Sequence, residues 1–249
     1  MIYDLIILGG GPAGYLAGER AGHAGLQTLL IEKDNVGGVC LNMGCIPTKA
    51  LLYSAKIADG AAHGGKYGII AENVKIDHKK VVERKNKIVK KLTGGVKAAL
   101  KANGVTVVKG TGIIKQKTAQ GYEIECEGEI YTGKRLLIAT GSSPAMPPIE
   151  GLKSAFESGF VLTNKEILEI EEVPTELVIV GGGVIGLEMA SYFNSAGSNV
   201  HVIEMLEKIA GMTDDDIATN LQKNYKKKGV IKKKIKKKKK SISTWAAKL

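Results

Sequence analysis

Residues 2–14 read IYDLIILGGGPAG, a short apolar run that passes directly into a glycine-rich turn. Residues 1–32 predict a strand, a glycine turn, a helix and a second strand that ends at Glu32. The turn has the pattern G-x-G-x-x-G, whose glycines permit tight folding and let a pyrophosphate approach the helix N-terminus. An acid after the second strand can bind ribose hydroxyls. The contacts predicted for this dinucleotide-binding unit are Gly9, Gly11, Pro12, Ala13, Gly14, Glu32 and Lys33.

A second copy of the glycine pattern follows the apolar residues 177–180. Residues from Leu187 predict a helix, and 199–203 predict a strand that ends at Glu204. One such pattern is a weak signal, but two copies, each between strand and helix and each with an acid after the second strand, are strong. An acid at position 204 repels a 2′-phosphate and so favours NAD over NADP. The predicted NAD contacts are Gly181, Gly183, Val184, Ile185, Gly186 and Glu204.

Two cysteines, Cys40 and Cys45, flank Gly44 at the predicted start of a helix that continues over 50–62. A pair at this spacing can close a small ring where the helix start is distorted, and a glycine helps that distortion. Thiolates at a helix N-terminus are stabilised and reactive. Two reduced core thiols or half a metal site are the other interpretations. A metal site would need further Cys or His nearby, and Cys126 is distant in sequence, so a redox dithiol is favoured.

The segment GGVCLNMGCIPTK at 37–49 resembles the active-site signature of the FAD-dependent pyridine nucleotide–disulfide oxidoreductases. The resemblance runs from Met1 to about Gly229, and the residues around the cysteines favour the dihydrolipoamide dehydrogenases over the glutathione or mercuric reductases. Val39 is a departure, because family members often carry a Thr there that can face the flavin. The implied fold is α/β, with two Rossmann-like domains, FAD then NAD. In the implied redox disulfide, Cys40 is the outer thiol and Cys45 lies against the flavin.

The resemblance also implies roles for residues outside the signature. Lys49 and Glu188 would form a catalytic ion pair near the reactive flavin nitrogen and help hold the cofactors. Residues 139–144, ATGSSP, match a family segment that lies against FAD. The further FAD contacts implied are Gly38, Val39, Lys49, Gly112, Ala139, Thr140 and Gly141. The implied reaction is the oxidation of dihydrolipoamide by NAD through FAD. A sister disulfide reductase and an inactive nucleotide-binding fragment remain as alternatives.

These patterns predict an FAD domain at 1–147, an incomplete NAD domain at 148–229 and an aberrant lysine-rich tail at 230–249. Residues 104–131 alternate β-rich stretches with glycines and predict an antiparallel meander inserted in the first domain. Residues 75–103 predict a lysine-rich helix whose polar face is mostly solvated.

The formal charge of +11 is concentrated in one tract. Residues 226–240 contain 11 lysines and no acid, so 11 − 11 leaves the rest of the chain near zero. This distribution argues against a nucleic-acid partner for the body of the chain. An erroneous or frame-shifted end, a solvated disordered tail, and an arm that binds nucleic acid or a membrane surface all remain open for the tract.

The resembled family closes its FAD site with a later Gly-Asp segment, forms a homodimer through a C-terminal domain and takes a catalytic His–Glu pair from the partner chain. The histidines of this chain lack the family's His-Pro context, so we expect surface or helix positions for them. The implied partners are lipoyl groups of a 2-oxo acid dehydrogenase or glycine cleavage complex. Met1 leads directly into an apolar strand and no stretch is suited to crossing a bilayer, which predicts a cytoplasmic protein without a membrane partner. No metal site is expected, because no further Cys or His lies near the dithiol in sequence.

Overall fold

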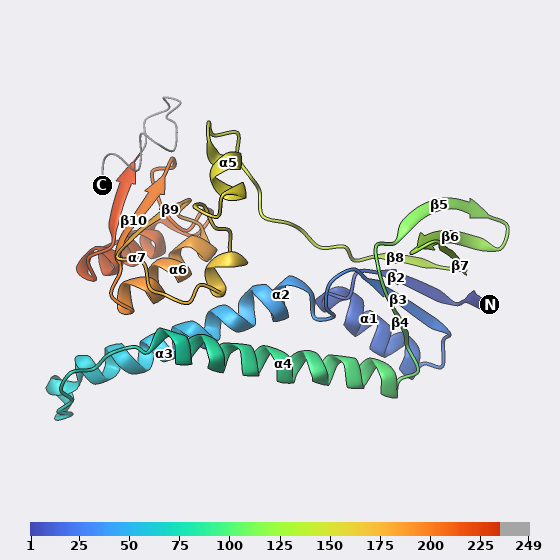
Figure 1. Ribbon diagram of the computed structural model, residues 1–249, viewed down its shortest axis with the longest axis horizontal. Coiled ribbons are helices and arrows are strands. Elements are labelled where there is room, and N and C mark those ends of the chain that lie inside the picture. Colours follow the sequence, from blue (N-terminus) through green and yellow to red (C-terminus); the bar gives the residue numbers. More distant parts are fainter. Residues whose placement is uncertain (235–249) are drawn as a thin grey trace. The chain divides into compact units, whose positions relative to one another are not determined.

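The computed structural model describes residues 1–234, and the chain divides into two compact units (Figure 1). Unit 1 comprises residues 1–47 and 86–143, and unit 2 comprises residues 48–85 and the chain from residue 144 onward. The strands of the described residues form three sheets, two in unit 1 and one in unit 2. The domain limits predicted at 147 and 229 stay predictions.

The central sheet of unit 1 is parallel, with strand order β4-β3-β2-β8. Its strands are β2 (Leu5–Leu8), β3 (Thr28–Glu32), β4 (Thr106–Lys109) and β8 (Leu136–Ile138), and α1 (Pro12–His23) links β2 to β3. The strand side chains Ile6, Ile7, Leu29 and Leu30 have no exposed surface. Burial on both faces explains why β2 and β3 are apolar without alternation. The carboxyl ends of these strands are the edge at which such sheets bind ligands.

The predicted meander is present as β5 (Ile113–Thr118), β6 (Gly121–Cys126) and β7 (Glu129–Gly133), and β1 (Ile2–Tyr3) joins β7 in parallel. The predicted range of 104–131 was too wide at its start. Residues 106–109 form β4 and pair in parallel with β3, because a strand reached through a helical crossover returns in the same direction. Residue Ile124 of β6 is fully buried against Leu8 and Ile31.

Three helices follow β3 along the chain: α2 (Gly38–Met43), α3 (Cys45–Ala62) and α4 (His78–Ala102), with a short 3₁₀ turn at Gly64–Tyr67. The solvated face predicted for α4 has an exception, because Lys85 is fully buried. Its Nζ donates to the Leu168 carbonyl at 2.8 Å and pairs with Glu169 Oε1 at 2.5 Å. A buried ammonium requires such partners. No helix in residues 1–234 combines the length and apolarity needed to cross a membrane.

Unit 2 repeats the strand–turn–helix–strand order of unit 1. Its sheet has the order β11-β10-β9, all parallel, with β9 (Glu176–Val180), β10 (Asn199–Glu204) and β11 (Ile231–Lys234). From residue 144 onward its helices are α5 (Leu152–Glu157), α6 (Val184–Ser195) and α7 (Asp215–Lys227), with a 3₁₀ turn at Glu166–Leu168, and most of α3 and the start of α4 also belong to this unit. Strand β11 falls within the predicted tail, and residues 235–249 of that tail lie outside the described residues. The predicted class, α/β with two Rossmann-like units and an inserted meander, is confirmed.

Candidate redox and dinucleotide sites

The first glycine turn, between β2 and α1, is closed by contacts that exclude any side chain. A Cβ on Gly14 would lie 1.8 Å from the Gly9 carbonyl oxygen. Gly9 has φ +99°, and a Cβ there would lie 2.3 Å from the Ala139 carbonyl oxygen and 3.1 Å from Thr140 Cα. The predicted segment after β8 therefore lies directly against the turn. Both glycines are required by backbone approach, and Gly9 is required by its conformation as well.

Glu32 is fixed at the end of β3 by two backbone amides. Gly10 N–H donates to Oε2 at 2.6 Å, and Asp34 N–H donates to Oε1 at 2.7 Å. Each carboxylate oxygen can accept more than one hydrogen bond. The carboxylate is therefore held beside the turn with acceptor capacity left for ribose hydroxyls.

The segment that leads to the cysteines starts on the first turn itself. Gly37 N–H donates to the Gly10 carbonyl at 2.7 Å. Gly38 has φ +59°, and a Cβ there would lie 2.6 Å from Gly11 Cα, so the two backbones are in contact. Asn42 Nδ2 donates to the Gly38 carbonyl at 2.9 Å and braces the short helix α2. The glycine turn and the dithiol segment are thus one continuous structure within unit 1.

Cys40 lies within α2 and is half-buried, whereas Cys45 is the first residue of α3 and is exposed. Between them, a Cβ on Gly44 would lie 2.8 Å from the Val39 carbonyl oxygen and 3.1 Å from Cys40 Cα. Because Gly44 has no side chain, the chain can fold back against Cys40 before α3 begins. Cys45 stands at a helix N-terminus, where the dipole favours negative charge. Burial raises the pKa of Cys126, with Glu127 and Glu129 adding to the shift, as befits an unreactive core thiol.

Lys49 and Glu188, which are 139 positions apart, meet in unit 2. Lys49 Nζ lies 2.5 Å from Glu188 Oε1, and the side chains are 59% and 24% exposed. The second turn of α6 thus carries a carboxylate that fixes an ammonium from the second turn of α3. The pair provides a cation held in one place, which is what stabilising a developing negative charge requires.

The second glycine turn, between β9 and α6, copies the internal bonds of the first. A Cβ on Gly186 would lie 2.4 Å from the Gly181 carbonyl oxygen. Gly182 N–H donates to Glu204 Oε2 at 2.7 Å, and Leu206 N–H donates to Oε1 at 2.8 Å. Among residues 1–234, no atom lies within 4 Å of a Cβ built on Gly181 or Gly183. Within the described residues, nothing therefore packs on this side of the turn.

Both helix N-termini can accept a pyrophosphate. Gly11 precedes α1 and Gly183 precedes α6, and no side chain of the described residues caps either helix. The first amides of each helix are free of helical partners by geometry. The predicted contacts Pro12 and Ala13 open α1, and Val184 and Ile185 open α6 with 64% and 57% of their surface exposed. The residues present therefore fit FAD at the first turn and NAD at the second.

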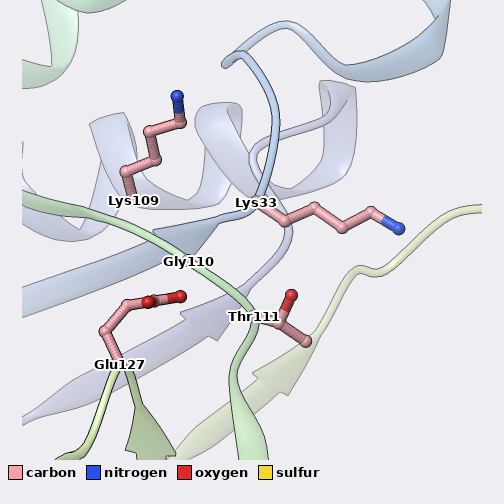
Figure 2. A pocket seen from close by; sticks show the side chains of 5 residues that line it. All are labelled: Lys33, Lys109, Gly110, Thr111 and Glu127. Atoms are coloured by element: carbon pink, nitrogen blue, oxygen red, sulfur yellow. The ribbon is translucent and has the colours of Figure 1, made fainter.

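A pocket of unit 1 lies at the ends of β3 and β4 (Figure 2). Lys33 follows β3, Lys109 ends β4, and Glu127 comes from the turn between β6 and β7. The predicted contact Gly112 does not line it. A Cβ on Gly112 would lie 2.5 Å from Leu8 Cδ2, so this glycine is needed for packing against the core. The lining residues are Lys33, Lys109, Gly110, Thr111 and Glu127.

Sequence reasoning missed a buried polar group in unit 2. His78 occupies a helix position, one of the two kinds expected for the histidines, but it is only 8% exposed. Its Nδ1 lies 2.7 Å from Tyr192 Oη, and its Nε2 lies 3.0 Å from the Ile170 carbonyl oxygen. Burial raises the pKa of Tyr192 to about 12. His78 opens α4 among charged residues, so no local pattern distinguishes it from an exposed helix start.

The chain is similar to known flavoenzymes in sequence and in structure. A family model described as pyridine nucleotide-disulphide oxidoreductase matches residues 3–244. A dihydrolipoyl dehydrogenase of Acholeplasma laidlawii is 46% identical over 92% of this chain and 67% of its own length. That of Bacillus subtilis is 41% identical over 91% of this chain and 49% of its own length. The HOCl-induced flavoprotein disulfide reductase RclA from Escherichia coli has a TM-score of 0.76 at 28% identity, covering 93% of this chain and 48% of that one.

The chain spans about half the length of most curated relatives that it matches. The shared half contains both glycine turns and the dithiol segment. On this sequence and structural evidence, the chain belongs to the pyridine nucleotide-disulphide oxidoreductase family.

Proposed function

We propose that this chain supplies the redox dithiol, the first FAD contacts and the NAD site of a dihydrolipoyl dehydrogenase. The observation that carries the proposal is the folding of Gly44 against Cys40, which returns the chain so that Cys45 starts α3. Gly38, packed on Gly11, joins this dithiol segment to the first glycine turn. The curated relatives named dihydrolipoyl dehydrogenase favour this activity among those of the family.

In the proposed reaction, a substrate thiolate attacks Cys40 Sγ of a Cys40–Cys45 disulfide. That S–S bond breaks, and its electron pair stays on Cys45 as a thiolate. The second substrate thiolate attacks the substrate sulfur of the mixed disulfide, closing lipoamide and releasing the Cys40 thiolate. The substrate loses two electrons, which the protein disulfide gains, and two protons pass to a base or to water.

The cofactor contacts follow from the two glycine turns. The amides that open α1, with Glu32 and Lys33, would hold FAD. Those that open α6, with Glu204, would hold NAD. When bound, FAD supplies two-electron transfer between the dithiol and NAD. The Lys49 ammonium, held by Glu188, would stabilise the negative charge of the reduced flavin.

A sister disulfide reductase is the second candidate, and the structural neighbours favour it. These neighbours are structures of a HOCl-induced flavoprotein disulfide reductase, at 28–29% identity. The dithiol arrangement serves either direction of thiol–disulfide exchange.

Under the first proposal the protein is cytoplasmic and homodimeric, and it acts on lipoyl groups of a 2-oxo acid dehydrogenase or glycine cleavage complex.

The test uses the natural full-length protein and the variants Cys45→Ser and Cys40→Ser. Each should abolish dihydrolipoamide-dependent NADH formation while flavin absorbance after gel filtration stays at the wild-type level. Cys126→Ala is the matched control, because it removes a thiol from the core of the meander. Retained turnover in Cys45→Ser would refute the dithiol role. Wild-type activity with oxidised glutathione but not with dihydrolipoamide would favour the sister reductase.

A further inference from the structure

The loop between β10 and α7, residues 205–214, supports the second glycine turn from one side. Ala210 N–H donates to the Gly182 carbonyl at 2.8 Å. Ile209 is 2% exposed, and its Cγ2 would lie 3.1 Å from a Cβ on Gly182. Leu206 N–H holds Glu204 at 2.8 Å. The loop therefore contacts both the turn and the acid of the proposed NAD site.

Ala210 donates this hydrogen bond from the left-handed backbone conformation, which favours glycine. Its φ is +64°, and Gly211 after it has φ +61°. In unit 1 the corresponding amide is that of Gly37, with φ +99°, which donates to the Gly10 carbonyl at 2.7 Å. A glycine adopts positive φ without steric cost, whereas an alanine needs its surroundings to impose it.

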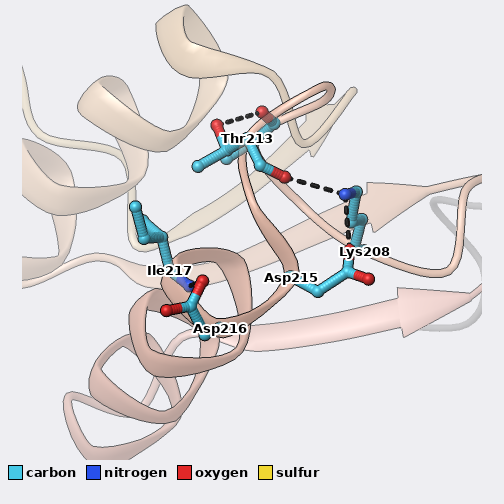
Figure 3. A network of polar contacts seen from close by, with 6 residues as sticks. Lys208, Thr213, Asp215, Asp216 and Ile217 are labelled. Atoms are coloured by element: carbon cyan, nitrogen blue, oxygen red, sulfur yellow. Dashed lines mark hydrogen bonds and ion pairs between the residues drawn. The ribbon is translucent and has the colours of Figure 1, made fainter.

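Lys208 clamps the loop that contains Ala210, and Figure 3 shows its bonds to Thr213 and Asp215. Lys208 Nζ donates to the Thr213 carbonyl at 2.7 Å and to Asp215 Oδ1 at 2.6 Å. Thr213 Oγ1 donates to the Ala210 carbonyl at 2.8 Å. The hydrogen bond and charge of Lys208 lower the pKa of Asp215, which is the first residue of α7. Residues 208–215 thus form a closed loop that contains both positive-φ residues.

We propose that Lys208 is a positioning residue of the dinucleotide site. Its clamp holds Ala210 in the left-handed conformation, and Ala210 in turn holds the Gly182 carbonyl and keeps the turn between β9 and α6 in its binding shape. Lys208 acts through the backbone and needs no contact with the nucleotide. The inference rests on the proposed function, because it takes the second turn to be the NAD site.

The first experiment measures the Kd for NAD of the full-length protein by titration calorimetry. Lys208→Met should raise the Kd about tenfold, since an unclamped loop must be ordered on binding. Lys208→Arg should recover most of the loss, because it keeps a charged donor. Lys223→Met is the matched control and should leave the Kd unchanged, because Lys223 is an exposed lysine of α7. Flavin content should stay constant throughout. An unchanged Kd in Lys208→Met would overturn the proposal.

The second experiment separates positioning from a direct charge effect. Ala210→Gly in the Lys208→Met background should bring the Kd back to within about threefold of wild type, because glycine reaches positive φ unaided. If Lys208 acted by attracting the nucleotide phosphates, Ala210→Gly would restore nothing and the proposal would fall.

Amide hydrogen exchange without nucleotide completes the test. Lys208→Met should speed exchange at Ala210 but not at Gly37. Because this measurement needs no nucleotide, it tests the positioning role even if the wild type does not bind NAD. Failure of the wild type to bind NAD would refute the proposed function alone. Unchanged exchange at Ala210 would refute the positioning role alone.

Discussion

The two glycine turns have the same internal bonds but different surroundings. In each, the second glycine donates to the acid that ends the next strand, Gly10 to Glu32 and Gly182 to Glu204. The first turn is covered, since Gly9 meets Ala139. Beside Gly181, no described residue comes within 4 Å of an added Cβ. The local sequence determines the turn, and its neighbours determine how a ligand reaches it.

The largest expected contrast comes from Gly9→Ala and Gly181→Ala. Both positions have positive φ, +99° and +108°, so both variants carry the cost of a left-handed alanine, about 1–2 kcal/mol. Only Gly9→Ala also drives a Cβ to 2.3 Å from the Ala139 carbonyl oxygen. We expect it to lose more than about 4 kcal/mol of unfolding free energy. Urea denaturation followed by circular dichroism measures both variants. Equal losses of unfolding free energy in the two variants would show that the contact of Gly9 with Ala139 does not affect stability.

The next contrast tests whether the two acids serve different ligands. Glu204→Arg should shift the preference from NAD toward NADP by about 1–3 kcal/mol, or roughly tenfold to over a hundredfold, because repulsion of a 2′-phosphate becomes attraction. Glu32→Arg should lower flavin content and leave that preference unchanged. Steady-state kinetics with both nucleotides and the flavin absorbance measure the two effects. A shift in NADP use caused by Glu32→Arg would contradict the assignment of the turns.

A smaller contrast concerns two tyrosines, one in each unit, whose pKa values are both raised to about 12. The hydrogen bond to Glu129 is the main cause for half-buried Tyr131, whereas burial is the cause for Tyr192. Glu129→Gln should therefore lower the pKa of Tyr131 toward 10 and leave Tyr192 unchanged in an ultraviolet titration.

The raised pKa of Tyr192 determines whether folding stability rises or falls with pH in the alkaline range. Between pH 10 and about 12 the unfolded state ionises this hydroxyl and the folded state does not, so stability falls as pH rises through that window. Tyr192→Phe should flatten this part of the pH dependence. An unaltered slope would show that Tyr192 is not protected by burial.

Much of this arrangement could be predicted from sequence, because a glycine pattern marks the positions at which two backbone segments come too close together for a side chain. The strands at 177–180 and 199–204, the helix that starts at the cysteines and the meeting of Lys49 with Glu188 all appear in the structure. The last came from family resemblance, since no local rule joins residues 139 positions apart.

What could not be predicted depends on tertiary partners. Lys85 looks like any solvated lysine until the Leu168 carbonyl and Glu169 are placed beside it. His78 likewise needs Tyr192. The positive φ of Ala210 is invisible in sequence, because alanine carries no signal for a left-handed conformation.

The smallest expected effect on stability comes from exchanging glycine and alanine at the two positions that support the turns, Ala210 and Gly37. Ala210→Gly relieves a left-handed alanine, worth about 1–2 kcal/mol, but adds unfolded-state freedom, which costs about 0.5–1 kcal/mol. We expect a net gain of about 1 kcal/mol or less. Gly37→Ala should destabilise, because it puts an alanine at φ +99° with its Cβ 2.9 Å from Leu41 Cβ. Thermal unfolding of both variants gives the signs. A loss in Ala210→Gly would mean that the clamp of Lys208 already removes the strain, and the turns would then differ in how they reach positive φ but not in what it costs.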